Sequence, residues 1–118
     1  MTKVDLKNRT KAYSLSIVRL VQEIPGDKVA NVLGRQLLRA ATSVGANYRA
    51  ACRARSTPDF IYKLKIVEEE CDESLYWLEL MRDAALVSAE KLKPLLVEGD
   101  EILAIIVSSL KTSRQNLG

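Results

Sequence analysis

The chain has 118 residues, of which 47% are hydrophobic and 28% are charged, and its formal net charge is +3. This composition is typical of a single globular domain with one core and excludes a disordered or fibrous chain. A chain of this length buries roughly two thirds of the surface that it exposes when unfolded, so one domain over residues 1–118 needs neither disulfide nor metal to fold.

Few helix breakers interrupt the sequence, and they divide it into four segments. Pro25 and Gly26 end the first segment, residues 56–58 separate the second from the third, and a polar stretch around Val87 and Ser88 separates the third from the fourth. Because these connections are short, neighbouring helices are expected to run antiparallel. We therefore predict an all-α fold, an antiparallel up-down-up-down four-helix bundle. Its helices are expected over about residues 6–24, 28–54, 57–85 and 89–113.

The first two segments each show one apolar face. In both, apolar side chains recur at spacings of three and four, the pattern of an amphipathic helix. The face of the first consists of Tyr13, Ile17, Leu20 and Ile24. The face of the second is expected to consist of Val29, Leu33, Leu37, Ala40, Val44 and Ala51. Both faces are expected to point into the bundle.

The third segment holds the same spacing over its whole length, from Phe60 to Ala85. Pro58 fits the first turn of a helix, so Ser56 or Thr57 is the expected N-cap. The remaining members of its face are Leu64, Val67, Cys71, Ser74, Leu78 and Met81.

The fourth segment carries its apolar face behind a serine cap. The face consists of Leu92, Leu96, Leu103, Ile106 and Leu110. Ser88 is the expected N-cap. Pro94 removes one backbone donor near this end, so we expect a kink there or a helix that begins at Pro94.

Charge is spread unevenly along the chain. Residues 27–55 carry six basic residues and one acidic residue, whereas residues 56–87 carry three basic and eight acidic ones. At about 100° per residue, most of these bases fall within an arc of roughly 80° on the second helix, opposite its apolar face. This basic ridge consists of Lys28, Arg35, Arg39, Arg49 and Arg53, and Arg55 follows it.

The basic ridge has two interpretations. Arginine suits bidentate contact with phosphate, so the ridge predicts a nucleic-acid-binding surface that contacts the backbone without reading sequence. Alternatively, the ridge pairs with the acidic third helix of the same or a neighbouring subunit, or is a solvated face. The sequence leaves both open.

The acidic third segment shows no pattern of a metal site. Di-metal bundles use Glu-x-x-His motifs that face the core, and this chain has no histidine. Most of its acids lie on the polar side, and only Glu70 lies near the edge of the core. A buried acid there needs a partner, such as a basic side chain or Asn47. We expect no metal.

Catalytic, redox and membrane roles have no support in the sequence. Histidine, the commonest general base, is absent, and there is no Gly-rich phosphate loop or nucleophile elbow. Cys52 and Cys71 lack a Cys-x-x-Cys spacing and are expected to be small buried hydrophobes. No leader and no apolar run of 18 residues is found. We expect a cytoplasmic protein that is no enzyme, needs no cofactor and contacts no membrane.

Several motifs resemble a known family. They are residues 36–47 (QLLRAATSVGAN), residues 56–60 (STPDF), Glu79 after the pair Trp77 and Leu78, and residues 108–112 (SSLKT). In order and spacing they resemble the bacterial four helix bundle protein family. Its members include the proteins encoded within intervening sequences of large-subunit ribosomal RNA genes. Its fold is similar to that of the accessory variability protein of diversity-generating retroelements.

The resemblance implies a homopentamer with a central channel. The retroelement accessory protein forms a positively charged barrel that binds a reverse transcriptase and nucleic acid. Carried over to this chain, Gly45 and Ala46 permit close helix approach, and Ser43 and Asn47 form a buried polar link. Residues 48–51 (YRAA) replace the family's usual Ile-x-Glu-Gly, which makes this surface more basic and puts any role of that glutamate in doubt.

Two functional hypotheses follow. The first is a non-enzymatic oligomeric adaptor that binds RNA or DNA backbone through Lys28, Arg35, Arg39, Arg49, Arg53 and Arg55, with a reverse transcriptase or another protein as partner. The alternative is a protein–protein scaffold with no nucleic-acid role.

Two helices carry a second apolar strip, which predicts self-association. Leu15 and Val18 lie roughly 100° to 160° away from Ile17, and Val97 and Ile105 fall outside the main face of the fourth helix. Burial against other subunits explains such positions, and a heterologous contact closes into a ring. Leu15, Val18, Val97 and Ile105 are therefore the expected oligomer interface, and the resemblance puts the subunit number at five.

Overall fold

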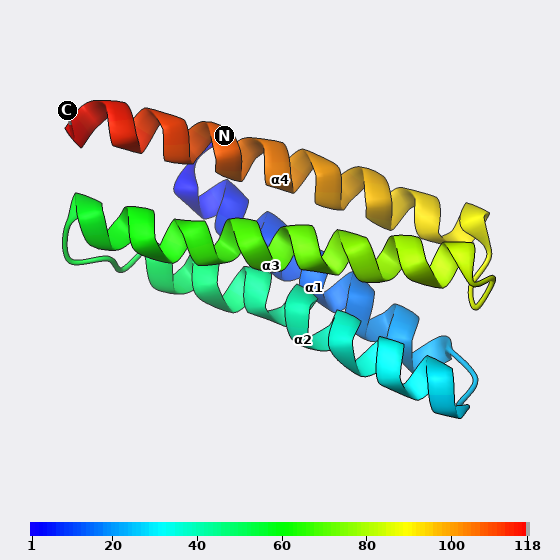
Figure 1. Cartoon of the computed structure of the whole chain (residues 1–118). Helices are drawn as coiled ribbons and strands as arrows, with labels where there is room; N and C mark the ends of the chain where they lie inside the picture. Colours follow the sequence, from blue (N-terminus) through cyan, green and yellow to red (C-terminus); the bar gives the residue numbers. More distant parts are fainter. Residues whose placement is uncertain (118) are drawn as a thin grey trace.

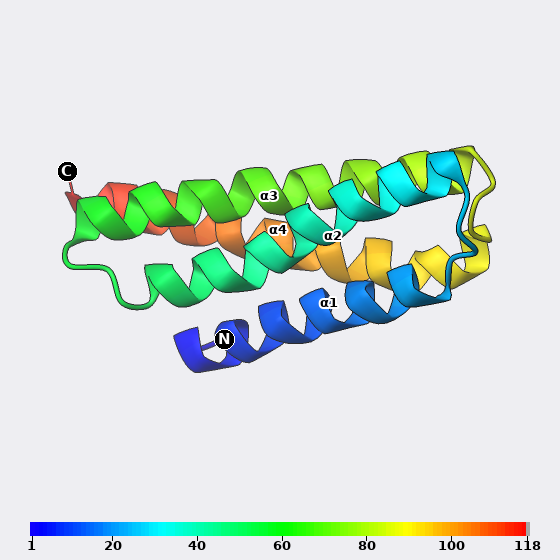
Figure 2. The same ribbon diagram turned by 90° about the horizontal axis from the view of Figure 1, so that it is seen from below.

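The computed structural model describes residues 1–117, which form four α-helices and no β-strand. Their bounds are Lys3–Glu23 for α1, Lys28–Ala51 for α2, Thr57–Asp83 for α3 and Ala89–Leu117 for α4. The molecule is elongated, with extents of 48 × 21 × 20 Å. Figure 1 shows α3 between α2 and α4, with α1 crossing obliquely behind them, and successive helices reverse direction in Figures 1 and 2. The prediction of an all-α, four-helix chain is confirmed.

The helix starts follow from local hydrogen bonds. The hydroxyl of Ser56 accepts a bond from the Asp59 N–H at 3.2 Å, and that of Ser88 accepts one from the Lys91 N–H at 3.2 Å, so both predicted N-caps are confirmed. The α1 helix begins at Lys3, earlier than expected, because Thr2 and the residue at its N3 position form a reciprocal capping box.

Two helix ends differ from the sequence-based expectation. The α3 helix ends at Asp83 because Ala85 adopts φ 57°, a left-handed backbone that stops a helix. The α4 helix begins at Ala89 and runs through Pro94, so of the two alternatives given for this proline, a kink or a helix start, the start is wrong. A proline so near the start removes only one intrahelical bond, and Ser88 supplies a cap ahead of it.

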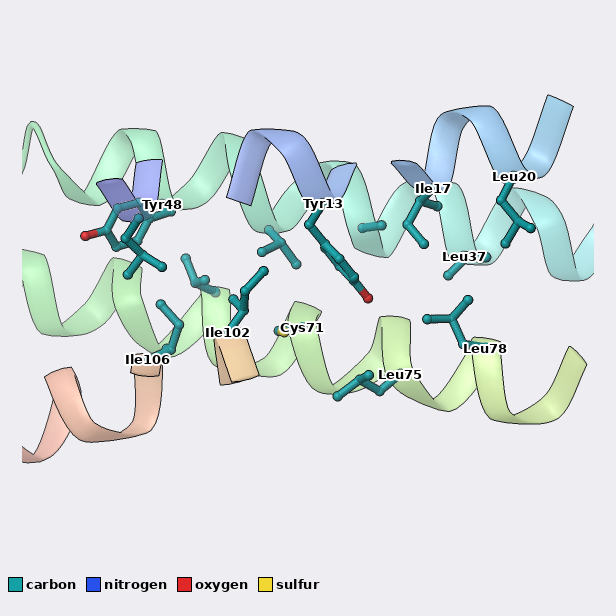
Figure 3. Packing of buried hydrophobic residues seen from close by; sticks show 14 of the residues in the cluster. Tyr13, Ile17, Leu20, Leu37, Tyr48, Cys71, Leu75, Leu78, Ile102 and Ile106 are labelled. Atoms are coloured by element: carbon teal, nitrogen blue, oxygen red, sulfur yellow. The ribbon is translucent and has the colours of Figure 1, made fainter. Parts of the chain in front are cut away.

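The predicted apolar faces meet in one core. Figure 3 shows side chains of all four helices interlocking along the long axis, with Ile17, Leu37 and Leu78 facing one another near one end. The large apolar side chains that are buried completely are Ile17, Leu37, Val44, Leu64, Val67, Leu78, Met81, Leu92, Ile102 and Ile106. Full burial of a side chain of this size contributes about 1.5–3 kcal/mol. This core is the main source of stability.

Some expected core residues lie elsewhere. Val29 is 56% exposed and Ala85 lies exposed beyond the end of α3. On α4 the helix is rotated, so Gly99 and Ile102 are buried while Leu96 and Leu103 are only half-buried. The apolar surface of α4 is wide enough for both the predicted and the observed rotation about the helix axis, and packing against the other helices decides between them. Of the two cysteines, Cys71 is buried as expected, and Cys52 is half-buried.

A buried polar chain joins three helices at mid-length. The Tyr13 hydroxyl of α1 lies 2.8 Å from the Ser74 hydroxyl of α3, which donates to the Cys71 carbonyl at 2.7 Å. The Cys71 thiol in turn contacts the Gly99 carbonyl of α4 at 3.5 Å. Burial raises the pKa of this thiol to about 12, so it is a protonated core residue. Cβ at Gly99 would lie 2.6 Å from Leu75 Cδ2, which shows how closely α4 approaches α3.

Helix α1 is held on one side by α2 and on the other by α4. Helix α1 packs extensively on α2, and its contact with α4 is the sparsest of the neighbouring pairs. At Gly45 of α2, an added Cβ would lie 3.0 Å from Ser14 Oγ and 3.4 Å from the Thr10 carbonyl. The close approach expected at Gly45 is thus present. On its other side, α1 is tied to α4 by Arg9, which donates to both oxygens of Glu98 at 2.6 and 2.7 Å.

Candidate nucleic-acid interface

The basic ridge runs along the outer face of α2. Its five members are all exposed, and the helix contains no acidic residue between Lys28 and Ala51. Helix α2 ends at Ala51, so Arg53, which was expected within the helix, lies with Arg55 in the connection that follows it. The backbone N–H of Arg55 donates to Asp59 at 3.1 Å, and this bond and Lys63 lower the pKa of that carboxyl. Six basic side chains thus line one side of α2 and its end.

One member of the ridge is paired within the chain. Arg39 donates to Glu70 at 2.9 Å and also forms an ion pair with Glu73, both on α3. The Glu70 side chain is only 18% exposed, so the basic partner predicted for it is present. Asn47 has another role, since its amide donates to the Ser43 carbonyl at 2.8 Å within α2, a link that is half-buried and not buried as expected. For Arg39, pairing with the acidic helix is the correct interpretation.

The other bases are not paired in this way. Among residues 1–117, the ion pairs include none of Lys28, Arg35, Arg49, Arg53 and Arg55. Of these five, only Arg55 lies beside an acid of α3, because its charge helps to lower the pKa of Asp59. Lys28, Arg35, Arg49 and Arg53 are exposed and outside these ion pairs, so they are available for an external anion.

A groove between α1 and α2 extends this surface. It is lined on α1 by Lys7, Asn8, Lys11 and Ser14, and on α2 by Thr42, Gly45, Ala46 and Arg49, and it encloses about 280 Å³. We call this the basic groove. Only Arg49 was a candidate from the sequence. Lys7 and Lys11 are four residues apart and therefore share one face of α1, which the sequence shows, but their position beside Arg49 depends on how the two helices cross.

The predicted oligomer interface is divided between exposed and packed side chains. Leu15 is 47% exposed and Val97 is 49% exposed, so both are free of the core. Val18 is half-buried. Ile105 is also half-buried and packs against the core, beside an opening between the start of α1 and the second half of α4. Leu15 and Val97 are therefore the better positions for testing self-association.

The described residues offer neither a metal centre nor a membrane-spanning helix. Among the described residues, no group of three or more His, Cys, Asp and Glu side chains is arranged to hold a metal ion. Over the same residues, no helix has both the length and the apolar character that crossing a bilayer requires.

Comparison with known proteins places the chain in a family. Residues 2–108 match the family described as 23S rRNA-intervening sequence protein. The chain belongs to the 23S rRNA-intervening sequence protein family. This match covers the basic groove and the whole basic ridge, and the suspected resemblance is confirmed.

A solved structure of the same kind supports the assignment. The chain is 32% identical to a protein of unknown function from the S23 ribosomal protein family of Bacteroides thetaiotaomicron, with a TM-score of 0.87. The alignment covers 94% of this chain and 99% of that one. Comparison with curated proteins gives no match. The comparisons thus give a fold and a family whose name refers to ribosomal RNA, with no biochemical activity attached.

Proposed function

We propose that this protein is a non-enzymatic oligomeric adaptor of the cytoplasm that binds the phosphate backbone of RNA or DNA through the basic face of α2. The observation that carries the proposal is the set of exposed basic side chains, Arg49 and Arg53 above all, that take part in no ion pair within residues 1–117. A reverse transcriptase is the protein partner that the family resemblance suggests.

The chemistry of the surface favours backbone contact over base readout. Arginine and lysine contribute most of their affinity by releasing counterions from phosphates, which needs no particular base sequence. The surface also carries no exposed aromatic side chain on α2 on which bases stack, since its only aromatic residue, Tyr48, is buried. Binding that is strong at low salt and indifferent to sequence is the expected behaviour.

The first prediction concerns salt. Labelled single- and double-stranded RNA and DNA of unrelated sequences are titrated with the protein at two salt concentrations, with fluorescence anisotropy as readout. We expect dissociation constants in the micromolar range, on the order of those of non-specific binding. The affinity is expected to fall at least tenfold when the salt concentration rises from about 50 to 200 mM. No binding of any of these nucleic acids at the lower salt would refute the proposal.

A second candidate function is a protein–protein scaffold without a nucleic-acid role. It is favoured by the ion pairs of Arg39, which show that this ridge also accepts carboxylates. Pull-down followed by nuclease treatment separates the two functions. Partners that survive nuclease and also survive substitution of both Arg49 and Arg53 favour the scaffold, whereas partners released by nuclease favour the adaptor.

The second prediction is self-association, for which the exposed Leu15 and Val97 are the support in this chain. The family resemblance suggests a pentamer, so light scattering coupled to size exclusion is expected to give a mass near five chains at micromolar concentration. Val97→Glu is expected to shift the mass toward one chain without loss of the helical circular-dichroism signal, because the side chain is not part of the core. Ile105→Glu is unsuitable here, since it also disturbs core packing. A wild-type mass of one chain contradicts the prediction.

A further inference from the structure

The basic groove owes its shape to the absence of side chains at its base. Gly45 has no side chain, and Ala46 beside it has only a methyl group, so the backbone of α2 forms the base. An added Cβ at Gly45 would lie 3.0 Å from Ser14 Oγ, so a larger residue would push α1 away. Small residues at this crossing both bring the helices together and leave a space of about 280 Å³ above them.

Three cations from two helices surround this space. Lys7 and Lys11 lie one turn apart on α1, and Arg49 faces them from α2. None of the three takes part in an ion pair within residues 1–117, and no acidic residue lines the groove. Like charges held close together repel one another, and a bound anion removes that repulsion.

The hydroxyl groups of the groove are already engaged. Ser14 Oγ donates to the Ala41 carbonyl at 2.7 Å, and Thr42 Oγ1 donates to the Leu38 carbonyl at 2.7 Å. Ser14 thereby fixes α1 against α2, so the groove is a built feature of the fold. The donors that remain free for a ligand belong to the two lysines, the arginine and the amide of Asn8, which together suit a compact oxyanion.

We propose that the basic groove is the phosphate-binding subsite of this protein and that it takes one backbone phosphate of RNA or DNA between Lys7, Lys11 and Arg49. The inference rests on the proposed function and moves the centre of binding from the middle of α2 to its edge with α1. The groove has about 280 Å³ of space and is open to solvent, so a phosphate group of a longer chain can enter it. Arg39 contributes little, because Glu70 and Glu73 already neutralise it.

The third prediction concerns two kinds of variant, one that removes positive charge from the basic groove and one that fills its space. The double variant Lys7→Gln, Lys11→Gln is expected to bind nucleic acid at least tenfold more weakly than wild type and to lower the slope of log affinity against log salt by about 0.7–0.9, the amount for one lost phosphate contact. Ala46→Leu keeps every charge and fills the groove, and we expect a similar loss of affinity. The control Lys93→Gln removes one exposed base on α4, far from the groove, and is expected to change affinity less than threefold.

The outcomes separate this inference from the proposed function. If wild type binds nucleic acid and neither groove variant weakens binding, the inference is wrong and the adaptor function stands. Inorganic pyrophosphate gives an independent reading, since its titration is expected to shift the amide NMR signals of Gly45 and Ala46 in wild type and not in the double variant. Those shifts without any nucleic-acid binding support the phosphate site and refute the adaptor. Circular dichroism and the mass of each variant verify that fold and assembly are retained.

Discussion

Replacing Tyr13 with alanine is expected to lower the free energy of unfolding by about 3–5 kcal/mol, the usual cost of deleting a buried aromatic ring. The side chain is 2% exposed and stands between α1 and α3 in Figure 3, with its hydroxyl 2.8 Å from Ser74. Because α1 has little contact with α4, the ring is one of the few large side chains that hold α1 to the far side of the core. The whole free energy of unfolding of a native protein is about 5–15 kcal/mol, so this loss is a large share of the stability.

The matched control is Tyr13→Phe, which removes only the hydroxyl. Ser74 then keeps its bond to the Cys71 carbonyl, so we expect a loss of about 1 kcal/mol, the net worth of one hydrogen bond. Urea unfolding followed by circular dichroism, at one fixed protein concentration, measures both variants. If alanine costs no more than phenylalanine, the ring does not hold α1 as described.

Much of the fold follows from features that are local in sequence. The helices were predictable because apolar spacing and breakers agree, and Ser56 and Ser88 were predictable caps because their hydroxyls precede long periodic runs. The ends were harder. The left-handed conformation of Ala85 has no sequence signal, since glycine is the usual residue there. The rotation of α4 depends on Gly99, whose burial against Leu75 is a packing effect that periodicity does not contain.

The candidate site was predictable only in part, for a similar reason. The ridge on α2 lies on one helix, so helical geometry was enough to place Arg35 and Arg49 on one face. Whether a given base is neutralised depends on a second helix, and only the structure pairs Arg39 with α3. Lys7 and Lys11 were missed because they join the site only through the crossing of α1 and α2. That crossing places them beside Arg49, about 40 positions away in the chain.

The double charge reversal Arg49→Glu, Arg53→Glu gives the largest expected effect on binding. Each substitution removes a cation that takes part in no ion pair among the described residues and places an anion beside the phosphate backbone, so the loss of affinity is expected to be on the order of a hundredfold or more at low salt. The loss is expected to be the same within a few fold for unrelated nucleic-acid sequences, because phosphate contacts carry no sequence information.

A variant of Arg39 tests whether binding depends on unpaired bases or on total charge. Arg39→Gln removes a base from the same ridge, but Glu70 and Glu73 have already neutralised that base. The affinity of this variant for nucleic acid is therefore expected to fall by no more than a few fold. Anisotropy titrations of both variants and wild type, in the same buffer and against the same RNA and DNA, give the comparison directly. Equal losses in the two variants would mean that affinity follows total charge alone, and the unpaired cations at the end of α2 would then have no special role.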